Sequence, residues 1–220
     1  MVGVVCALAA EARHLGPDER TRVTVSGMGL EAAGAGARAL IQAGAGALVS
    51  WGMAGGLDPG LAPGAILLPT EVVALDGTVI ETATSWRKQM ADAIGASVVM
   101  GRLLTSNTAI GSIEDKSRLF RETGAVAVDM ESLAVAAAAR AHHLPFLAIR
   151  VIVDSAADAL PHAVTTAANG KGHLHVWRLL GALARKPAEL APLIRLAQRY
   201  RAANRSLAAV ARVGALVPCQ

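Results

Sequence analysis

The chain has 220 residues, of which 53% are hydrophobic and 17% are charged, and its formal net charge is +4. This length and composition suit one well-buried α/β domain and leave too little for two, so we expect a single domain over residues 1–220. Aromatic residues make up only 3% of the chain, which argues against a stacking platform for single-stranded nucleic acid.

The start of the chain and its cysteines indicate a cytoplasmic protein. The apolar run at residues 1–8 has no basic leader and meets Glu11 almost at once, so we expect no secretory signal peptide. Cys6 lies in an apolar run and Cys219 next to the C-terminus, a pattern that predicts neither a disulfide framework nor a zinc site. The histidines show no ligand spacing with a third partner, so we predict no metal.

Apolar runs alternate with segments of helical pattern along the chain, which predicts a three-layer α/β/α fold with a central, mostly parallel or mixed sheet. The predicted strands are residues 2–8, 22–26, 47–51, 66–69, 71–74, 98–104, 125–128 and 144–153. The predicted helices are a short one within residues 9–15, an Ala-rich one between the last two strands, and residues 30–43, 83–94, 113–122, 163–184 and 188–213.

The last predicted helix, residues 188–213, is basic. From Lys171 onward nine basic residues accompany a single acid, Glu189, whereas the rest of the chain is mildly acidic. Apolar and basic residues alternate here at helical spacing, and a solvated outer face explains much of this pattern. A helix lying with its apolar side on an anionic bilayer would explain the one-sided charge as well, and both interpretations stay open.

Two acids follow the strands on either side of the Ala-rich helix. Glu131 comes just after residues 125–128, and Asp154 ends residues 144–153. Because ligands of an open α/β sheet bind beyond the carboxyl ends of its strands, we expect both acids to face one cavity. Each acid also has a plainer explanation, since Glu131 suits the first turn of a helix and Asp154 could cap one. Desolvation would raise the pKa of Asp154 toward that of a proton donor.

Two glycine-rich segments follow strands. Residues 27–32 resemble a dinucleotide fingerprint, but the next strand ends without an acid, so we discount a nicotinamide cofactor. Residues 52–64 contain glycines and prolines that we expect to exclude regular structure. At the start of that segment the backbone N–H groups of Met53, Ala54 and Gly55 could bind an anion or a sugar hydroxyl, although a simple turn that needs glycine is an equal alternative.

The motifs VDMES, which contains Glu131, and R-x-x-x-D, which runs from Arg150 to Asp154, together resemble the signature of the superfamily of purine nucleoside phosphorylases and methylthioadenosine/S-adenosylhomocysteine nucleosidases. The resemblance implies that Glu131 binds the ribose hydroxyls beside the apolar surface of Met130, and that Asp154 protonates the purine N7. It also implies that Glu11 activates water. Arg150 would position the loop of Asp154 or the carboxylate on the nucleophile side.

Met53 stands where the superfamily commonly has a hydroxyl residue, which favours water over phosphate as the nucleophile. The segments GMAGGLDPGLAPG and LPFLAIRVIVD and the basic tail are most similar to the hopanoid-associated members, which are thought to remove adenine from adenosylhopane. The resemblance therefore implies a small-molecule or lipid-linked adenine nucleoside as substrate, no cofactor, a homo-oligomer, and peripheral contact of the tail with an anionic membrane. A methylthioadenosine/S-adenosylhomocysteine nucleosidase, a phosphorylase and a non-catalytic nucleoside-binding protein stay open as alternatives.

Overall fold

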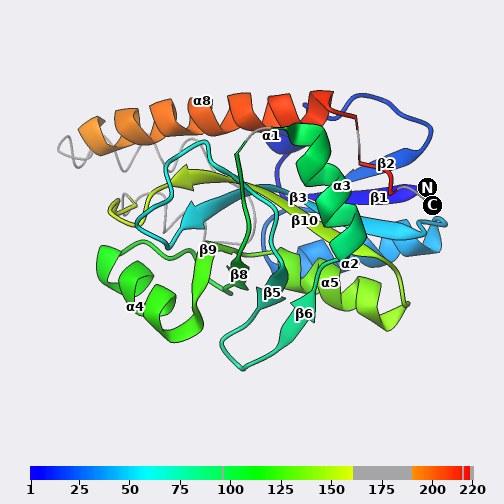
Figure 1. Cartoon of the computed structure of the whole chain (residues 1–220), viewed down its shortest axis with the longest axis horizontal. Helices are drawn as coiled ribbons and strands as arrows, with labels where there is room; N and C mark the ends of the chain where they lie inside the picture. The colour runs from blue at the N-terminus through cyan, green and yellow to red at the C-terminus, as the bar shows by residue number, and fades with distance from the viewer. Residues whose placement is uncertain (96, 161–189, 215, 219–220) are drawn as a thin grey trace.

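A mixed β-sheet lies between two layers of helices in the computed structural model, which describes residues 1–95, 97–160, 190–214 and 216–218 (Figure 1). The strands in these residues are β1 (Val2–Cys6), β2 (Thr21–Val25), β3 (Ala47–Gly56), β4 (Ile66–Leu67), β5 (Glu71–Val73), β6 (Val79–Glu81), β7 (Val98–Val99), β8 (Arg102–Thr105), β9 (Ala125–Asp129) and β10 (Phe146–Asp154). The helices are α1 (Ala9–Ala12), α2 (Leu30–Gln42), α3 (Thr84–Ile94), α4 (Ile113–Thr123), α5 (Ser132–Ala141) and α8 (Leu190–Arg212). The helix predicted over residues 163–184 lies outside the described residues.

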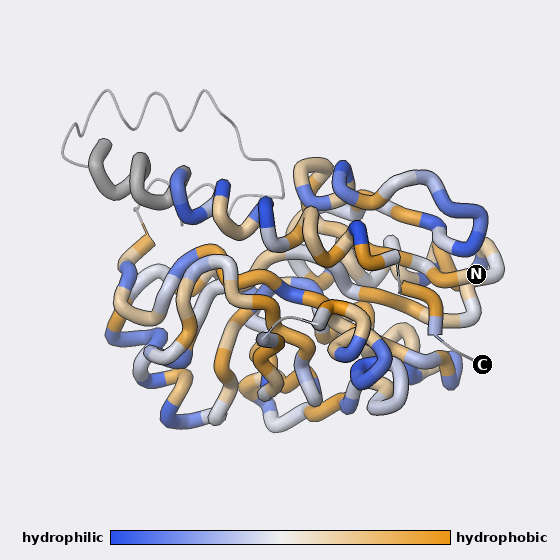
Figure 2. Tube along the Cα trace, turned by 45° about the horizontal axis from the view of Figure 1, so that its top comes forward, coloured by the Kyte–Doolittle hydropathy of each residue, from blue (hydrophilic) through white to orange (hydrophobic). Residues whose placement is uncertain are grey.

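The helices pack on both faces of the sheet through apolar side chains. On one face α2 and α5 bury alanine, valine and leucine side chains against the central strands. On the other face α3 buries Trp86 and Met90, and α8 buries alanine, leucine and valine side chains. Figure 2 shows that the central strands are mostly hydrophobic, whereas hydrophilic segments recur along α8. The predicted three-layer fold with a mixed sheet is confirmed.

Strand β3 is the centre of the sheet and the element around which the cavity described below is built. Along one edge it pairs in parallel with β10, from Leu48 to Gly55. Along the other edge it pairs first with β1, in parallel, and then at Gly55 and Gly56 with β9, in antiparallel orientation. The prediction that residues 52–64 have no regular structure is therefore wrong for residues 52–56, because strands on both edges hold this segment extended, and it is confirmed for residues 57–64.

Two other strand predictions differ from the structure. Residues 98–104 form two strands, β7 and β8, rather than one. The chain breaks at Gly101, where a Cβ atom would lie 2.9 Å from a methyl group of Val126. The short strand β6, which pairs antiparallel with β5, was not predicted because its three residues carry little periodic signal.

Helix α8 runs across the face of the sheet beside β10 (Figure 1). Its side chains Ala203, Leu207 and Val210 are buried against that face, while Arg201 and Arg205 are exposed. The proposal that this helix lies with its apolar side on a bilayer is wrong for these turns, because the sheet already covers that side. Among the described residues, no helix combines the length and the hydropathy needed to cross a membrane.

Candidate active site

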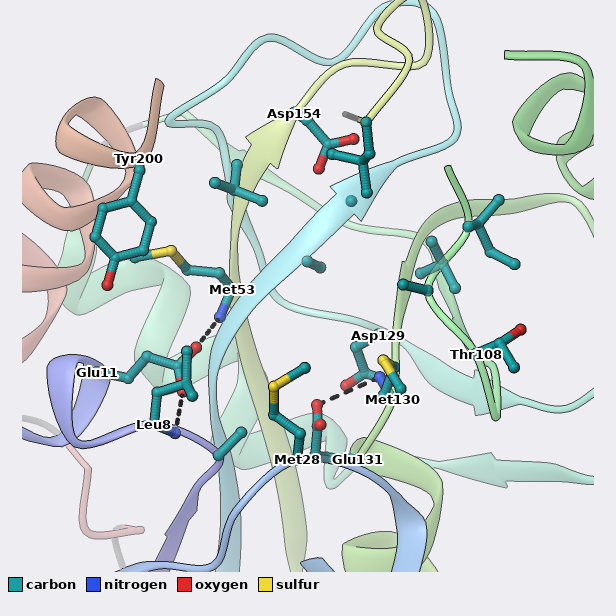
Figure 3. Close-up of a pocket in the computed structure, with 18 residues that line it drawn as sticks. Leu8, Glu11, Met28, Met53, Thr108, Asp129, Met130, Glu131, Asp154 and Tyr200 are labelled. Atoms are coloured by element: carbon teal, nitrogen blue, oxygen red, sulfur yellow. Dashed lines mark hydrogen bonds between the residues drawn. The ribbon is translucent and has the colours of Figure 1, made fainter. Parts of the chain in front are cut away.

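A cavity of about 240 Å³ lies beside the second half of β3, between the ends of β9 and β10, the turn before α1, and α8. Its wall includes the four carboxylates of Glu11, Asp129, Glu131 and Asp154 and several apolar side chains (Figure 3). Asp154 lies at one end of the cavity, whereas Glu11 and Glu131 lie toward the other. Met28, Met53 and Tyr200 also line the cavity, with Met28 beside Glu131 and Met53 between Glu11 and Asp154 in this view.

Glu131 and Asp154 share this cavity, as predicted, but for a different reason from the one that the sequence suggested. Strand β9 runs antiparallel to β3, so the carboxyl ends of β9 and β10 do not lie at a common edge of a parallel sheet. Val128 and Asp154 instead both lie opposite Gly55, on opposite edges of β3. The chain after Val128 continues in the direction of β9, toward the start of β3, and this course brings Glu131 to the same cavity.

Glu11 is held by main-chain donors at the start of the chain. It lies on α1, directly after β1, and only 4% of its surface is exposed. Its Oε2 accepts a hydrogen bond from the Leu8 N–H at 3.0 Å, and its Oε1 accepts one from the Met53 N–H at 3.0 Å. Burial raises the pKa of the Glu11 carboxyl, and the positive charge of Arg150 offsets part of that rise. A buried carboxylate with fixed orientation and a raised pKa is suited to accept a proton.

Glu131 lies just before α5, and a glycine turn from a distant part of the chain holds it. Its Oε1 accepts a hydrogen bond from the Gly29 N–H at 2.9 Å, and its Oε2 accepts a weaker one from the Met130 N–H at 3.3 Å. Burial, and secondly the charge of Asp129, raises the pKa of Glu131 to about 7. The turn containing Gly29, where φ is +91°, thus positions a carboxylate rather than a dinucleotide phosphate.

Asp154 is paired with a lysine that sequence reasoning missed. Lys116, on α4, is fully buried and donates hydrogen bonds to Asp154 Oδ2, to the Ser155 carbonyl at 2.9 Å and to the Asp158 carbonyl at 2.8 Å. Burial raises the pKa of the Asp154 carboxyl, and Lys116 offsets part of that rise. The sequence did contain a signal, because Lys116 lies three residues before the buried Leu119, on the inward face of the helix.

Arg150 is fully buried and belongs to a polar cluster beside the cavity. Its Nε–H donates to Asp129 Oδ2 at 2.9 Å, and its terminal nitrogen donates to Ser50 Oγ at 2.6 Å and to Ser132 Oγ at 3.0 Å. In the described part of the chain it therefore contacts Asp129 rather than the loop of Asp154 that it was expected to position. Its charge does lower the pKa of both glutamates, which is compatible with the alternative role on the nucleophile side.

Asp129 holds the start of α5 through its side chain. Its Oδ2 accepts the N–H of Ser132, the first residue of α5, at 3.1 Å. Its Oδ1 accepts the hydroxyl hydrogen of Thr105 at 2.7 Å. Through Asp129, the Arg150 cluster fixes the start of α5 and with it the neighbouring Glu131.

Met53, Ala54 and Gly55 line the cavity, but not as a glycine loop with free N–H groups. They continue β3 and pair with β10 from Val151 to Asp154. The N–H of Met53 is taken by Glu11, so the proposed anion cradle is wrong for this group. Gly55 is needed for another reason, since a Cβ atom there would lie 3.4 Å from Asp154 Oδ1.

The chemistry that this cavity can perform follows from its three buried carboxyls with raised pKa values. One end can donate a proton through Asp154, and the other can bind hydroxyl groups and accept a proton through Glu131 and Glu11. The apolar wall between them suits a flat or hydrophobic ligand surface. Within the described residues, no group of three His, Cys, Asp or Glu side chains could hold a metal ion.

Comparisons with known proteins identify the family of the chain. Residues 14–181 match the family model described as the phosphorylase superfamily. The chain is 30% identical over 135 residues to a 5'-methylthioadenosine/S-adenosylhomocysteine nucleosidase of Baumannia cicadellinicola subsp. Homalodisca coagulata. That alignment covers 52% of this chain and 58% of the relative, so the chain matches a little more than half the length of this curated protein.

Solved structures share the fold over most of the chain. A 5'-methylthioadenosine/S-adenosylhomocysteine nucleosidase from Neisseria meningitidis, in complex with methylthio-immucillin-A, superimposes with a TM-score of 0.73 at 18% identity and covers 98% of this chain and 99% of its own. The futalosine hydrolase of Helicobacter pylori gives a TM-score of 0.66 at 20% identity and covers 83% of this chain and 97% of its own. At these identities the likeness establishes the fold alone.

Proposed function

The chain belongs to the phosphorylase superfamily, and from that premise we propose that it is an enzyme that cleaves the N-glycosidic bond of an adenine nucleoside and releases adenine. The observation that carries the proposal is the shared cavity with Asp154 at one end and Glu11 and Glu131 toward the other. A nucleoside has a basic ring nitrogen at one end and sugar hydroxyls at the other. These two groups require a proton donor and a hydroxyl-binding carboxylate on opposite sides of one site.

In this proposal Asp154 protonates N7 of adenine. The bond between C1' and N9 then breaks with its electron pair moving to N9, and adenine leaves as a neutral molecule. Glu131 accepts hydrogen bonds from the ribose hydroxyls, and its negative charge stabilises the cationic sugar that forms. Glu11 takes a proton from the water molecule that attacks C1', so the sugar leaves with a hydroxyl group at C1' and keeps the group on its 5' carbon.

Water is favoured over phosphate as the nucleophile by the charges of the cavity. Its described lining contains acidic groups such as Glu11 and Glu131 but no lysine, arginine or histidine. A phosphate anion would therefore meet carboxylates without a cation from the described wall. Met53, in the position that often carries a hydroxyl group in the superfamily, offers an apolar side chain. These features support a nucleosidase rather than a phosphorylase.

For the substrate we propose a lipid-linked adenine nucleoside, with adenosylhopane as the specific candidate. The apolar cavity wall, which includes Leu8, Met28 and Tyr200, would accommodate a hydrophobic group on the sugar. The outward side of α8 carries Arg201, Arg205 and Arg212, which would attract the protein to the anionic surface in which such a lipid resides. Methylthioadenosine or S-adenosylhomocysteine is the competing substrate, in keeping with the name of the Baumannia relative.

From the resemblance to the superfamily we also propose that the chain forms a homo-oligomer. Analytical ultracentrifugation of the purified protein tests this directly, because a single species at the monomer mass would exclude it. The activity assay below does not depend on the outcome.

One assay tests the activity and separates the alternatives. Adenine release is measured with and without phosphate, for wild type and for Asp154→Asn, on methylthioadenosine, S-adenosylhomocysteine and an adenosyl lipid in detergent micelles. We expect phosphate-independent release, and a decrease of about 10²- to 10⁴-fold in Asp154→Asn because general acid catalysis is lost. Asp76→Asn is the matched control, since this aspartate is exposed in the turn between β5 and β6 and does not line the cavity.

Each outcome of this assay has one meaning. Release that requires phosphate and yields ribose 1-phosphate would identify a phosphorylase. Faster turnover of methylthioadenosine than of the lipid would replace the lipid as substrate. Adenine binding without release from any of the three nucleosides would mean a non-catalytic binding protein.

A further inference from the structure

The most unusual group near the cavity is the buried ammonium of Lys116. Its side chain is fully buried, and its three hydrogen-bond donors are matched by Asp154 Oδ2 and the carbonyls of Ser155 and Asp158. A lysine in such a place loses its hydration, and these three acceptors replace the water molecules around its ammonium group. The sequence motifs of the cavity do not include Lys116, and the reaction described above does not use it.

The ion pair creates a difficulty for the proposed reaction. A cation in hydrogen-bond contact with Asp154 favours the carboxylate form, and a carboxylate has no proton to give to a base. The same contact also provides the solution. The ammonium N–H donates directly to the carboxylate oxygen in a buried site, where the loss of hydration disfavours both charges and the proton can move along the hydrogen bond.

We propose that Lys116 is a positioning residue that stores the proton which Asp154 delivers to the leaving base. This inference rests on the proposed adenine release. An N–H bond of Lys116 breaks as an O–H bond forms on Asp154; that O–H bond then breaks as the N7–H bond forms and the C1'–N9 bond breaks. Lys116 is left as a neutral amine, Glu11 has gained a proton from water, and solvent restores both groups after the products leave.

The other charged groups near Lys116 and Asp154 have little effect on the proposed proton exchange between these two residues. The other charged groups that act on Asp154 are Asp158, in the segment after β10, and Arg199, on α8. These two form an ion pair of 2.7 Å, so their charges largely cancel at the cavity. On α4 the acids next to Lys116 are exposed to solvent, and β3 presents Gly55 to Asp154. Among the described residues, burial and the contact with Lys116 therefore have the largest effects on the pKa of Asp154.

The test compares two substitutions that separate charge from proton supply. Arginine at this position keeps a cation and hydrogen-bond donors but cannot release a proton. Lys116→Arg should therefore hold Asp154 ionised and lower kcat for adenine release about 10²-fold or more at every pH. Methionine has a similar length but no charge, so Lys116→Met leaves Asp154 as a lone buried carboxyl. That carboxyl is protonated at acidic pH, so Lys116→Met should be active there and lose activity as pH rises through the raised pKa of Asp154.

A second substrate makes the result specific for proton delivery. A 4-nitrophenyl riboside has a leaving group that departs as an anion without protonation. We expect both Lys116 variants to cleave it at rates near that of wild type, which also shows that they are folded. Lys88→Arg and Lys88→Met are matched controls, since Lys88 is exposed on α3 and should leave both substrates unaffected.

The outcomes that overturn the proposal are equally specific. Adenine release by Lys116→Arg at the rate and with the pH profile of wild type would show that no proton leaves this position. An equal decrease on both substrates would show a structural role only. If wild type released no adenine from any nucleoside, the proposed function itself would fail. Adenine release by wild type is therefore measured before any variant is tested. If Lys116→Met does not fold, the ratio of the two substrates in Lys116→Arg decides alone.

Discussion

A Cβ atom on Gly52 would lie 2.6 Å from Oε1 of Glu11. The carboxylate of Glu11 thus occupies the space that any other residue at this position of β3 would need. In return the strand supplies the next N–H, that of Met53, as a hydrogen-bond donor to the same oxygen. The glycine therefore helps α1 and β3 to hold Glu11, the proposed water-activating group, in place.

The first prediction concerns this contact. Gly52→Ala should displace the Glu11 carboxylate from the Met53 N–H and lower kcat for adenine release about 10²-fold, because a shift of about 1 Å in a reacting group has that effect. The overpacking should also lower the free energy of unfolding by about 1–3 kcal/mol. Gly46→Ala is the matched control, since a Cβ atom there has no neighbour within 4 Å. Equal activity of the two variants in the adenine assay would contradict the prediction.

The second prediction concerns the pH dependence of stability. The pKa of Glu131 is about 7 in the folded protein, and its ordinary value of 4.5 applies to the unfolded chain. Between pH 4.5 and pH 7 the folded state therefore retains a proton that the unfolded state has lost. The stability that Glu131 contributes is thus fully present below about pH 4.5 and is lost as pH rises through about 7. At about 1.4 kcal/mol per pKa unit, the loss is about 3 kcal/mol.

Urea unfolding of wild type and Glu131→Gln across this pH range isolates the effect, because Glu11 and Asp154 titrate in both proteins. We expect the free energy of unfolding of wild type, relative to the variant, to fall by about 3 kcal/mol between about pH 4.5 and pH 8. A difference that does not change with pH would mean that Glu131 is ionised throughout. The variant should also bind the ribose more weakly, since a neutral amide accepts fewer hydroxyl hydrogen bonds than a carboxylate.

The third prediction separates structural from catalytic roles at Arg150. Arg150→Met removes the buried cation and leaves Asp129 uncompensated, which should lower the free energy of unfolding by about 3–5 kcal/mol. Removing both partners in Arg150→Met/Asp129→Asn should cost less than the single change. Arg118→Met, which breaks two exposed ion pairs on α4, should change stability by about 1 kcal/mol or less. Similar unfolding midpoints for Arg150→Met and Arg118→Met would contradict this account.

The sequence predicted the layers and most elements correctly because their signals are local. The apolar runs that became β1 and β10 and the Ala-rich pattern of α5 each require only short-range periodicity. The end of β3 was predicted as a loop because glycine usually weakens a strand. Here the pairing strands hold the segment extended, and Gly52 and Gly55 have to be glycine because carboxylates from α1 and β10 approach them closely. Both causes are properties of the tertiary structure.

The acids of the cavity could be predicted from the sequence, but their partners could not. Glu131 and Asp154 follow apolar runs within recognisable motifs, whereas Gly29 and Lys116 come from segments that are distant from them in the sequence. Nothing local in a charged helix distinguishes a buried lysine from an exposed one except its place on the inward face. The antiparallel course of β9 is also a long-range property, and it decides on which side of β3 Glu131 lies.

The last prediction concerns the outward side of α8. Because its apolar side packs on the sheet, binding to a membrane would depend on the exposed Arg201, Arg205 and Arg212, each contributing about 1 kcal/mol near an anionic surface. Replacing all three by glutamine should weaken sedimentation with phosphatidylserine-containing vesicles roughly 100-fold at low salt. Turnover of methylthioadenosine in solution should be unchanged.

The matched control for this experiment removes the same charge from other exposed sites. Arg20, Arg118 and Arg121 replaced together by glutamine reduce the net charge equally but lie outside α8. If binding depends on net charge alone, the two triple variants will weaken together, and the place of α8 beside the cavity will be irrelevant to membrane contact. If only the α8 variant loses binding and also turns over a vesicle-borne adenosyl lipid more slowly, the helix presents the cavity to the surface. Wild type that sediments equally with neutral and anionic vesicles would contradict the electrostatic account, because attraction to a charged surface must depend on that charge.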